Sequence, residues 1–188
     1  MSSVNGLLKA LAGIGLAIGG AWALKRLLSP EARDDVRDFV VSRVRYAAQV
    51  LGIAAPPVVE SSDVPNAASD GVRILWNRQW VLRTLSAHCT DGWCQDEVVL
   101  GIVAHELAHH HLRHAARGDQ DPRQSELDAD FYAGFVLAAA GRGTERLEAV
   151  LFTQSYWPTP SHPEGHLRVV AIRQGREQAM AQRLGWAT

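Results

Sequence analysis

Apolar residues recur along most of this 188-residue chain at the three- and four-residue spacing of helices. The clearest apolar stripes cover residues 30–51, 98–117 and 122–140. Two of these stripes begin with a capping residue and a proline, Ser29-Pro30 and Asp121-Pro122, and both end at a glycine. The pattern therefore predicts a domain built mostly of helices.

Two short apolar runs, residues 58–61 and 72–76, have the composition of strands rather than helices. Residues 62–71 between them are rich in turn-forming residues, and Asn77 is placed to begin a helix over residues 78–87. A few strands among many helices predict an α+β domain with one small sheet.

Two further helices are expected in the last third of the chain. Thr144 can cap a short helix, and a loop containing Trp and Pro follows over residues 153–160. Ser161 and Glu164 match a capping box for a last helix, which would place His162 in its first turn.

The N-terminal residues form a separate hydrophobic segment. Residues 10–24 carry no charge, but they are fewer than the about 20 residues that usually span a bilayer. We favour a membrane anchor through residues 7–28, with a cleaved signal peptide or a loosely buried helix as alternatives. More basic residues follow this segment than precede it, so the positive-inside rule favours a cytoplasmic domain over a periplasmic or secreted one. The expected organisation is an anchor or signal segment over residues 1–28 and one domain over residues 29–188.

The second stripe contains the H-E-x-x-H pattern, His105 to His109. Positions four apart share one helix face, so these two imidazoles can hold one zinc ion. Glu106 is turned about 100° away and can reach a metal-bound water without binding the metal. Such a water ionises near neutral pH, and Glu106 can take its proton and pass it to a leaving amine. Asp96 and Glu97 would suit the first turn of this helix, and Gly118 its end.

Chance is the alternative explanation for this motif. Five of the eight histidines lie within residues 105–114, so the H-x-x-x-H spacing arises easily. His110 and His114 form a second pair with the same spacing on another face. We interpret this second pair as solvated surface or as support behind the metal ligands.

Three acidic residues, Glu126, Asp128 and Asp130, are crowded into five positions of the third stripe. They repel one another unless a cation offsets their charge, although a solvated acidic face is the alternative. The seventeen residues from His109 to Glu126 allow a turn and a returning helix, so Glu126 can supply a third zinc ligand. Asp130 can then accept the outer N–H of a ligating histidine, and Gly134 would let the two helices approach closely.

Charge and cysteine content add two constraints. Nineteen basic and twenty acidic residues give a net charge of −1, so we expect no nucleic-acid partner. Cys89 and Cys94 can form a small disulfide loop in an oxidising compartment or stay reduced in the cytosol. They are less favoured as zinc ligands because no second cysteine pair completes a four-ligand site.

Three segments, in this order and spacing, resemble the gluzincin metallopeptidases of the HtpX and CAAX-prenyl-endopeptidase family. They are AHELAHHHLRH, SELDADFYAGFVL and SHPEGHLRVVAI. The resemblance covers about residues 64–175 and implies a zincin-like fold, with a small antiparallel or mixed sheet above the metal-site helix. It also implies peptide hydrolysis that depends on one Zn²⁺ ion.

The resemblance implies roles for individual residues. Glu126 would be the third zinc ligand, in a segment that also holds Asp130. His162 would help to bind the tetrahedral oxyanion, and Arg168 would brace the carboxylates of the zinc site. Residues 64–69, VPNAAS, are similar to the family's segment before the edge strand, which binds extended substrates by strand addition. The chain departs from large family members in lacking several membrane spans.

The expected function is therefore that of a singly anchored zinc metalloendopeptidase that acts on peptides or unfolded proteins. The resemblance suggests quality control of damaged membrane proteins. One alternative is a catalytically silent zinc-binding scaffold at the membrane, and another is a zinc amidase that is not a peptidase. In a further possibility, the N-terminal helix covers the cleft as a self-inhibiting plug.

Overall fold

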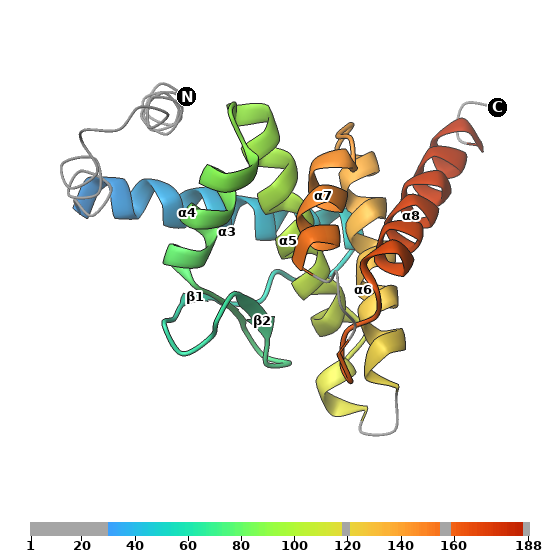
Figure 1. The fold of residues 1–188 in the computed structure, drawn as a ribbon, viewed down its shortest axis with the longest axis horizontal. Helices are drawn as coiled ribbons and strands as arrows, with labels where there is room; N and C mark the ends of the chain where they lie inside the picture. Colours follow the sequence, from blue (N-terminus) through green and yellow to red (C-terminus); the bar gives the residue numbers. More distant parts are fainter. Residues whose placement is uncertain (1–29, 118–120, 155–158, 186–188) are drawn as a thin grey trace.

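The computed structural model describes residues 30–117, 121–154 and 159–185 (Figure 1). The expectations for an anchor, a signal peptide or a plug over residues 1–28 lie outside these ranges. Within them, no helix combines the length and apolar character needed to cross a membrane.

The described residues form a mostly helical α+β structure with a small mixed sheet. The elements in chain order are α3 (Pro30–Leu51), β1 (Val58–Glu60), β2 (Ala67–Ser69), β3 (Ile74–Trp76), α4 (Arg78–His88), α5 (Gly92–His111), the 3₁₀ helix η1 (His114–Ala116), α6 (Pro122–Ala139), α7 (Glu145–Gln154) and α8 (Gly165–Gly185). In Figure 1, the sheet lies at one end of the helical body, and α6 and α8 form the side farthest from it.

The sheet has the strand order β1-β3-β2. Strand β1 is parallel to β3, and β2 is antiparallel to β3, with Ala67 opposite Trp76. Strand β2 therefore lies at an edge, and it packs on α5. The composition of residues 62–71 did not indicate β2 as a strand, because β2 is short and made of small residues, and its pairing with β3 defines it.

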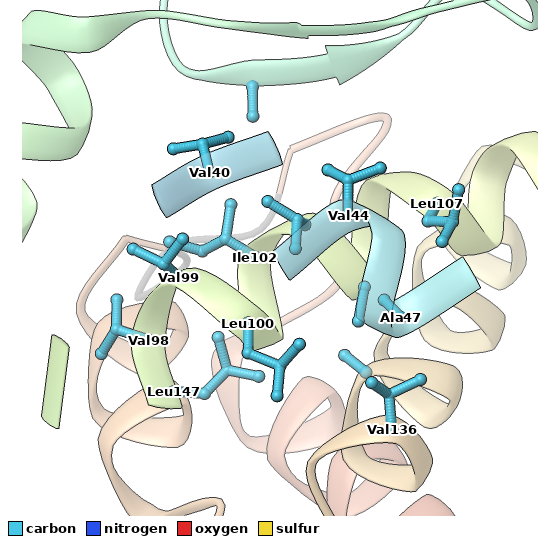
Figure 2. Packing of buried hydrophobic residues seen from close by; sticks show 14 of the residues in the cluster. Val40, Val44, Ala47, Val98, Val99, Leu100, Ile102, Leu107, Val136 and Leu147 are labelled. Atoms are coloured by element: carbon cyan, nitrogen blue, oxygen red, sulfur yellow. The ribbon is translucent and has the colours of Figure 1, made fainter. Parts of the chain in front are cut away.

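Helix α5 is the centre of the core, and it is buried along most of its length. Its apolar side chains pack between those of α3, α6 and α7 (Figure 2). The residues labelled there are Val40, Val44, Ala47, Val98, Val99, Leu100, Ile102, Leu107, Val136 and Leu147. A helix enclosed on several sides is held firmly, so residues on its remaining face have well-defined positions.

The ends of α5 differ from the prediction. The Asp91 side chain accepts a hydrogen bond from the Cys94 N–H at 2.8 Å, so the helix begins one turn before Asp96. Asp96 is therefore not at the helix start; it is buried and pairs with Arg43 and Arg142. The helix ends at His111, well before the predicted end at Gly118. Cys94 also forms a disulfide with Cys89, which links α5 to the end of α4.

Gly134 allows a close helix approach, but with a different partner from the one expected. A Cβ atom at Gly134 would lie 1.9 Å from the Ile172 carbonyl oxygen of α8, rather than near α5. Gly175 of α8 has the reciprocal role, since a Cβ there would lie 1.8 Å from the Phe131 oxygen of α6. The two glycines bring the backbones of α6 and α8 together, which places the start of α8 beside the start of α6.

Candidate metal centre

Two helices bring His105, His109 and Glu126 to one point. The Nε2 atoms of the two histidines, one turn apart on α5, are 3.1 Å from each other. Glu126, on α6, places Oε2 at 3.5 Å from His105 Nε2 and Oε1 at 3.4 Å from His109 Nε2. One ligand atom from each residue thus lies within 4.8 Å of the others. The structure therefore assembles the three predicted ligand side chains.

The spacing of these atoms fits one tetrahedral ion. Two ligand atoms about 2.05 Å from a zinc ion, at a tetrahedral angle, lie about 3.3 Å apart. The two Nε2 atoms are 3.1 Å apart, and each lies 3.4 or 3.5 Å from its nearer Glu126 oxygen, which are two different oxygens of that carboxylate. With one ligand atom taken from each residue, all three lie within 4.8 Å of one another. Two imidazoles and a carboxylate are also a common donor set for catalytic zinc. The residues present fit the ion that the sequence predicts.

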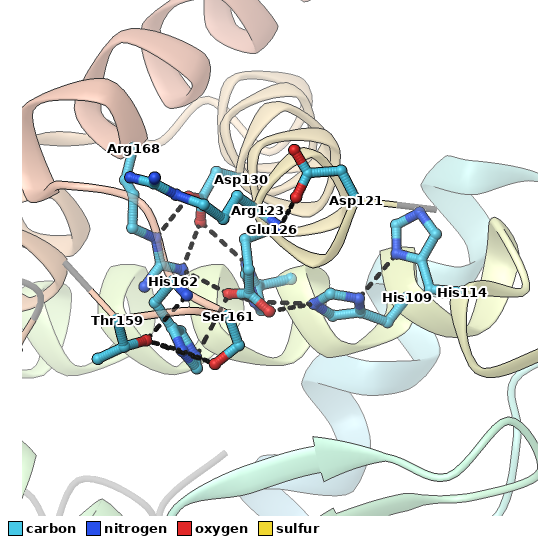
Figure 3. A network of polar contacts seen from close by, with 11 residues as sticks. His109, His114, Asp121, Arg123, Glu126, Asp130, Thr159, Ser161, His162 and Arg168 are labelled. Atoms are coloured by element: carbon cyan, nitrogen blue, oxygen red, sulfur yellow. Dashed lines mark hydrogen bonds and ion pairs between the residues drawn. The ribbon is translucent and has the colours of Figure 1, made fainter. Parts of the chain in front are cut away.

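Asp130 and Arg168 support the cluster from behind (Figure 3). The outer nitrogen of His105, Nδ1, is 2.9 Å from Asp130 Oδ1, the contact that the spacing of the acids predicted. Arg168 donates from Nε to Asp130 Oδ2 at 2.7 Å and from a terminal nitrogen to Oδ1 at 2.9 Å. That guanidinium also lies 3.5 Å from Glu126 Oε2. Arg168 therefore contacts both carboxylates.

The electrostatics of the cluster favour positive charge between the ligands. Burial lowers the pKa of His105, but the hydrogen bonds that its ring donates to Asp130 and Glu126 outweigh this effect and raise the pKa to about 10. For Glu126 the two effects have the opposite signs. Burial alone would raise its pKa, but its contacts with the two histidines outweigh burial and hold the pKa well below its usual range. A cation is therefore stabilised at the point where the three ligands meet.

Glu106 lies beside the cluster, in the wall of an open pocket of about 640 Å³. His105 and His109 line the same pocket. Burial raises the pKa of Glu106, and the neighbouring imidazoles partly oppose that rise. A carboxyl group with a raised pKa is suited to accept and return a proton near neutral pH.

His162 lies in the loop before α8 and lines the same pocket. Its Nε2 is 3.7 Å from Glu126 Oε2, and its side chain is 46% exposed. The expectation that Ser161 begins the helix was wrong: α8 begins at Gly165, and the Glu164 carboxylate accepts a hydrogen bond from Arg123 of α6 instead of capping α8. His162 is therefore a loop residue whose position depends on the contact between α6 and α8.

Two other walls of the pocket differ in character. Backbone and side-chain atoms of β2, the edge strand, line one wall. Apolar side chains from three helices also line the pocket: Ile102 of α5, Trp80 of α4 and Leu151 of α7.

Several contacts near His162 were not predicted from the sequence. Ser161 Oγ lies 2.9 Å from His162 Nδ1, and Thr159 Oγ1 lies 3.2 Å from the same atom. These contacts are local, and the only signal for them was the density of polar side chains next to a His-Pro pair. The Arg123–Glu164 pair, with a hydrogen bond of 2.7 Å, joins the starts of α6 and α8, and no periodicity connects residues 41 positions apart.

The metal-ligand motif, the acidic segment and the His-Pro segment all contribute to one pocket. Comparisons with protein-family models, with curated proteins and with solved structures found no match to this chain.

Proposed function

We propose that this protein is a zinc-dependent endopeptidase with a zincin-like fold, related to the HtpX and CAAX-prenyl-endopeptidase family. The observation that carries the proposal is the convergence of His105, His109 and Glu126 in one pocket, with Glu106 in its wall. The proposed ligands are these two histidines and Glu126, holding one Zn²⁺ ion. A structural zinc site usually has four protein ligands, whereas three leave a position for water or substrate.

Each residue of the pocket has a defined task in peptide hydrolysis. A zinc ion held here supplies a Lewis acid, which polarises a peptide carbonyl and lowers the pKa of water. The Glu106 carboxylate accepts a proton from the water that adds to the carbonyl carbon. It then gives this proton to the amine nitrogen as the C–N bond breaks. The raised pKa of Glu106 supports both transfers.

His162 and Arg168 stabilise charge in different places. His162 lines the pocket with its Nε2 3.7 Å from Glu126 Oε2, so its ring N–H can donate to the oxyanion that forms at the carbonyl. A donor of this kind typically contributes about 3 kcal/mol to transition-state stabilisation. Arg168 is buried against Asp130 and Glu126, so we propose that it positions these carboxylates and does not touch the substrate.

The proposed substrate is an extended peptide or an unfolded protein segment. Strand β2 is an edge strand paired with β3, and its residues line the pocket, so its unpaired edge can bind a substrate backbone. Attachment to a membrane through residues 7–28 and a role in membrane-protein quality control belong to the same proposal. The basic residues after that segment favour a cytoplasmic domain, whereas the Cys89–Cys94 disulfide fits the alternative of an oxidising, periplasmic or secreted location.

The test compares the full-length chain with Glu106→Gln, using an unfolded protein as the substrate and measuring zinc content in both. The variant should bind zinc and lose turnover by about 10²- to 10⁴-fold, because the amide cannot take the proton. Wild-type cleavage should stop with a chelator and return with zinc. An active, zinc-loaded variant would refute the role of Glu106.

A second pair of variants tests the ligand set. Glu126→Ala should lose tight zinc binding, whereas Asp128→Ala, two residues away and not in the lining of the pocket, should keep it. If Glu126→Ala holds zinc with undiminished affinity, another residue is the ligand, and Asp130 is the next candidate. If wild type and Glu106→Gln both bind zinc and neither cleaves, the result supports a zinc-binding scaffold instead.

A further inference from the structure

The two ligand histidines have different partners at their outer nitrogens. The Nδ1 of His105 meets a carboxylate, that of Asp130. The Nδ1 of His109 instead meets a third imidazole, with 2.8 Å between it and the Nδ1 of His114. In Figure 3, His109 lies between Glu126 and His114, so His114 stands behind the ligand ring, on the side away from the carboxylate.

The protonation pattern of this pair follows from ligand chemistry. A neutral imidazole carries one N–H, and the nitrogen that binds a metal must offer a lone pair. His109 therefore carries its proton on Nδ1 when Nε2 is a ligand. A hydrogen bond of 2.8 Å then requires a lone pair on His114 Nδ1, which leaves the proton of His114 on Nε2.

Two features of the structure around His114 are unfavourable in free energy. His114 Nε2 is buried and has no hydrogen-bond partner within the described part of the chain. The preceding residue, Arg113, has the left-handed φ of 57°, which costs a residue other than glycine about 1 kcal/mol. Unpaired buried groups and left-handed residues persist where the surroundings require that geometry, and they concentrate at functional sites.

We propose that His114 is a positioning residue for the metal centre: it accepts the Nδ1–H of His109 and thereby keeps His109 Nε2 available as a ligand. This inference rests on the proposed zinc site, because only a metal at Nε2 dictates the tautomer. Asp130 has the equivalent task for His105. After α5 ends, the chain turns at Arg113, which has a left-handed φ, and continues into the 3₁₀ helix η1. This turn places His114 beside His109.

The test measures zinc affinity rather than activity, using the full-length chain and a competing chelator. His114→Leu removes the acceptor and should weaken zinc binding by about 10- to 100-fold, the usual effect of losing such a partner. His114→Asn places an acceptor oxygen near the original Nδ1 position and should restore affinity to within a few-fold of wild type. His111→Leu is the matched control, because that ring packs on Tyr132 and should not affect affinity.

A second measurement does not depend on variants that fold. Nitrogen-15 NMR of the zinc-loaded wild type should show His105 and His109 protonated at Nδ1 and His114 protonated at Nε2.

Zinc affinity that is unchanged in a folded His114→Leu chain, or a His114 proton on Nδ1 in the loaded protein, would overturn the inference. If wild type binds zinc with these tautomers but cleaves nothing, the peptidase proposal fails and the role of His114 stands. If wild type binds no zinc, both fail.

Discussion

His105 and Glu97 lie on the same helix and are both buried, but their surroundings affect their charge in opposite ways. His105 has the carboxylates of Asp130 and Glu126 beside it, which stabilise its positive form. Glu97 accepts a hydrogen bond from the Arg146 N–H at 2.7 Å, but burial and the nearby Glu145 disfavour its ionised form. Burial therefore raises the pKa of Glu97, and its charge is a source of instability in the folded protein.

Glu97→Gln should make the protein more stable at neutral pH. A pKa that is higher in the folded state than in the unfolded state contributes stability at low pH, which is lost as the pH rises through the folded-state value. Glutamine carries no charge at any pH, and its oxygen can still accept the Arg146 N–H. The gain in unfolding free energy, measured by denaturant titration, should be present at pH 7.5 and vanish near pH 4.

Glu177→Gln, which removes an exposed carboxylate on α8, is the control and should change stability little at either pH. A Glu97→Gln chain that is no more stable than wild type at pH 7.5 would show that the hydrogen bond outweighs the burial of the charge.

Individual helices follow local signals closely. Asn77 accepts a hydrogen bond from the Trp80 N–H at 3.0 Å and begins α4 as predicted, and α3 and α6 begin at their prolines. Gly52 and Gly141 follow α3 and α6 with left-handed φ values of 68° and 70°. The starts of α5 and α8 were missed because each depends on a choice between several polar residues, which tertiary contacts decide.

The approach of α6 to α8 gives a prediction at the scale of elements. Gly134→Ala should destabilise the fold by about 3 kcal/mol, because its Cβ would meet the Ile172 carbonyl and force the two backbones apart. Thermal or denaturant unfolding measures this loss. Gly141→Ala is the comparison: it lies in open space and should cost only about 1 kcal/mol for its left-handed conformation.

The separation of α6 from α8 should also disturb the metal centre. Arg168 on α8 holds Asp130 and contacts Glu126 on α6, so the two helices share the support of the ligands. If Gly134→Ala is as stable as wild type, the two helices are not held by this close contact.

For the molecule as a whole, zinc should bind only the folded chain tightly, because the ligands come from α5 and α6 and meet only after folding. Zinc at about 1,000 times its Kd should add about 4 kcal/mol of stability. In a chain of this size that raises Tm by about 10 °C. The measurement is thermal unfolding of the full-length chain with and without zinc.

Glu126→Ala should show a much smaller shift, and magnesium should produce none, because this donor set suits zinc better than a hard oxygen-seeking cation. An equal rise in Tm for wild type and Glu126→Ala would mean that the stabilising ion binds elsewhere.

By itself, the sequence determined the helical character of the chain, most helix boundaries and the pairing of His105 with His109. These features depend on spacing within one helix or on residues next to a turn, so they are local and visible in the order of residues. The sequence predicted Glu126 as a third ligand, because the seventeen residues after His109 allow a turn and a returning helix. That spacing does not by itself require the helix to return to the two histidines.

Only the tertiary structure decided which of the remaining candidates meet. It placed Glu126 rather than Asp128 between the two histidines, gave His109 the partner His114, and set Gly134 against α8. It also made an edge strand of Ala67–Ser69 along the pocket. These contacts join segments that are distant in the chain, and they depend on how the helices pack, which no local pattern specifies.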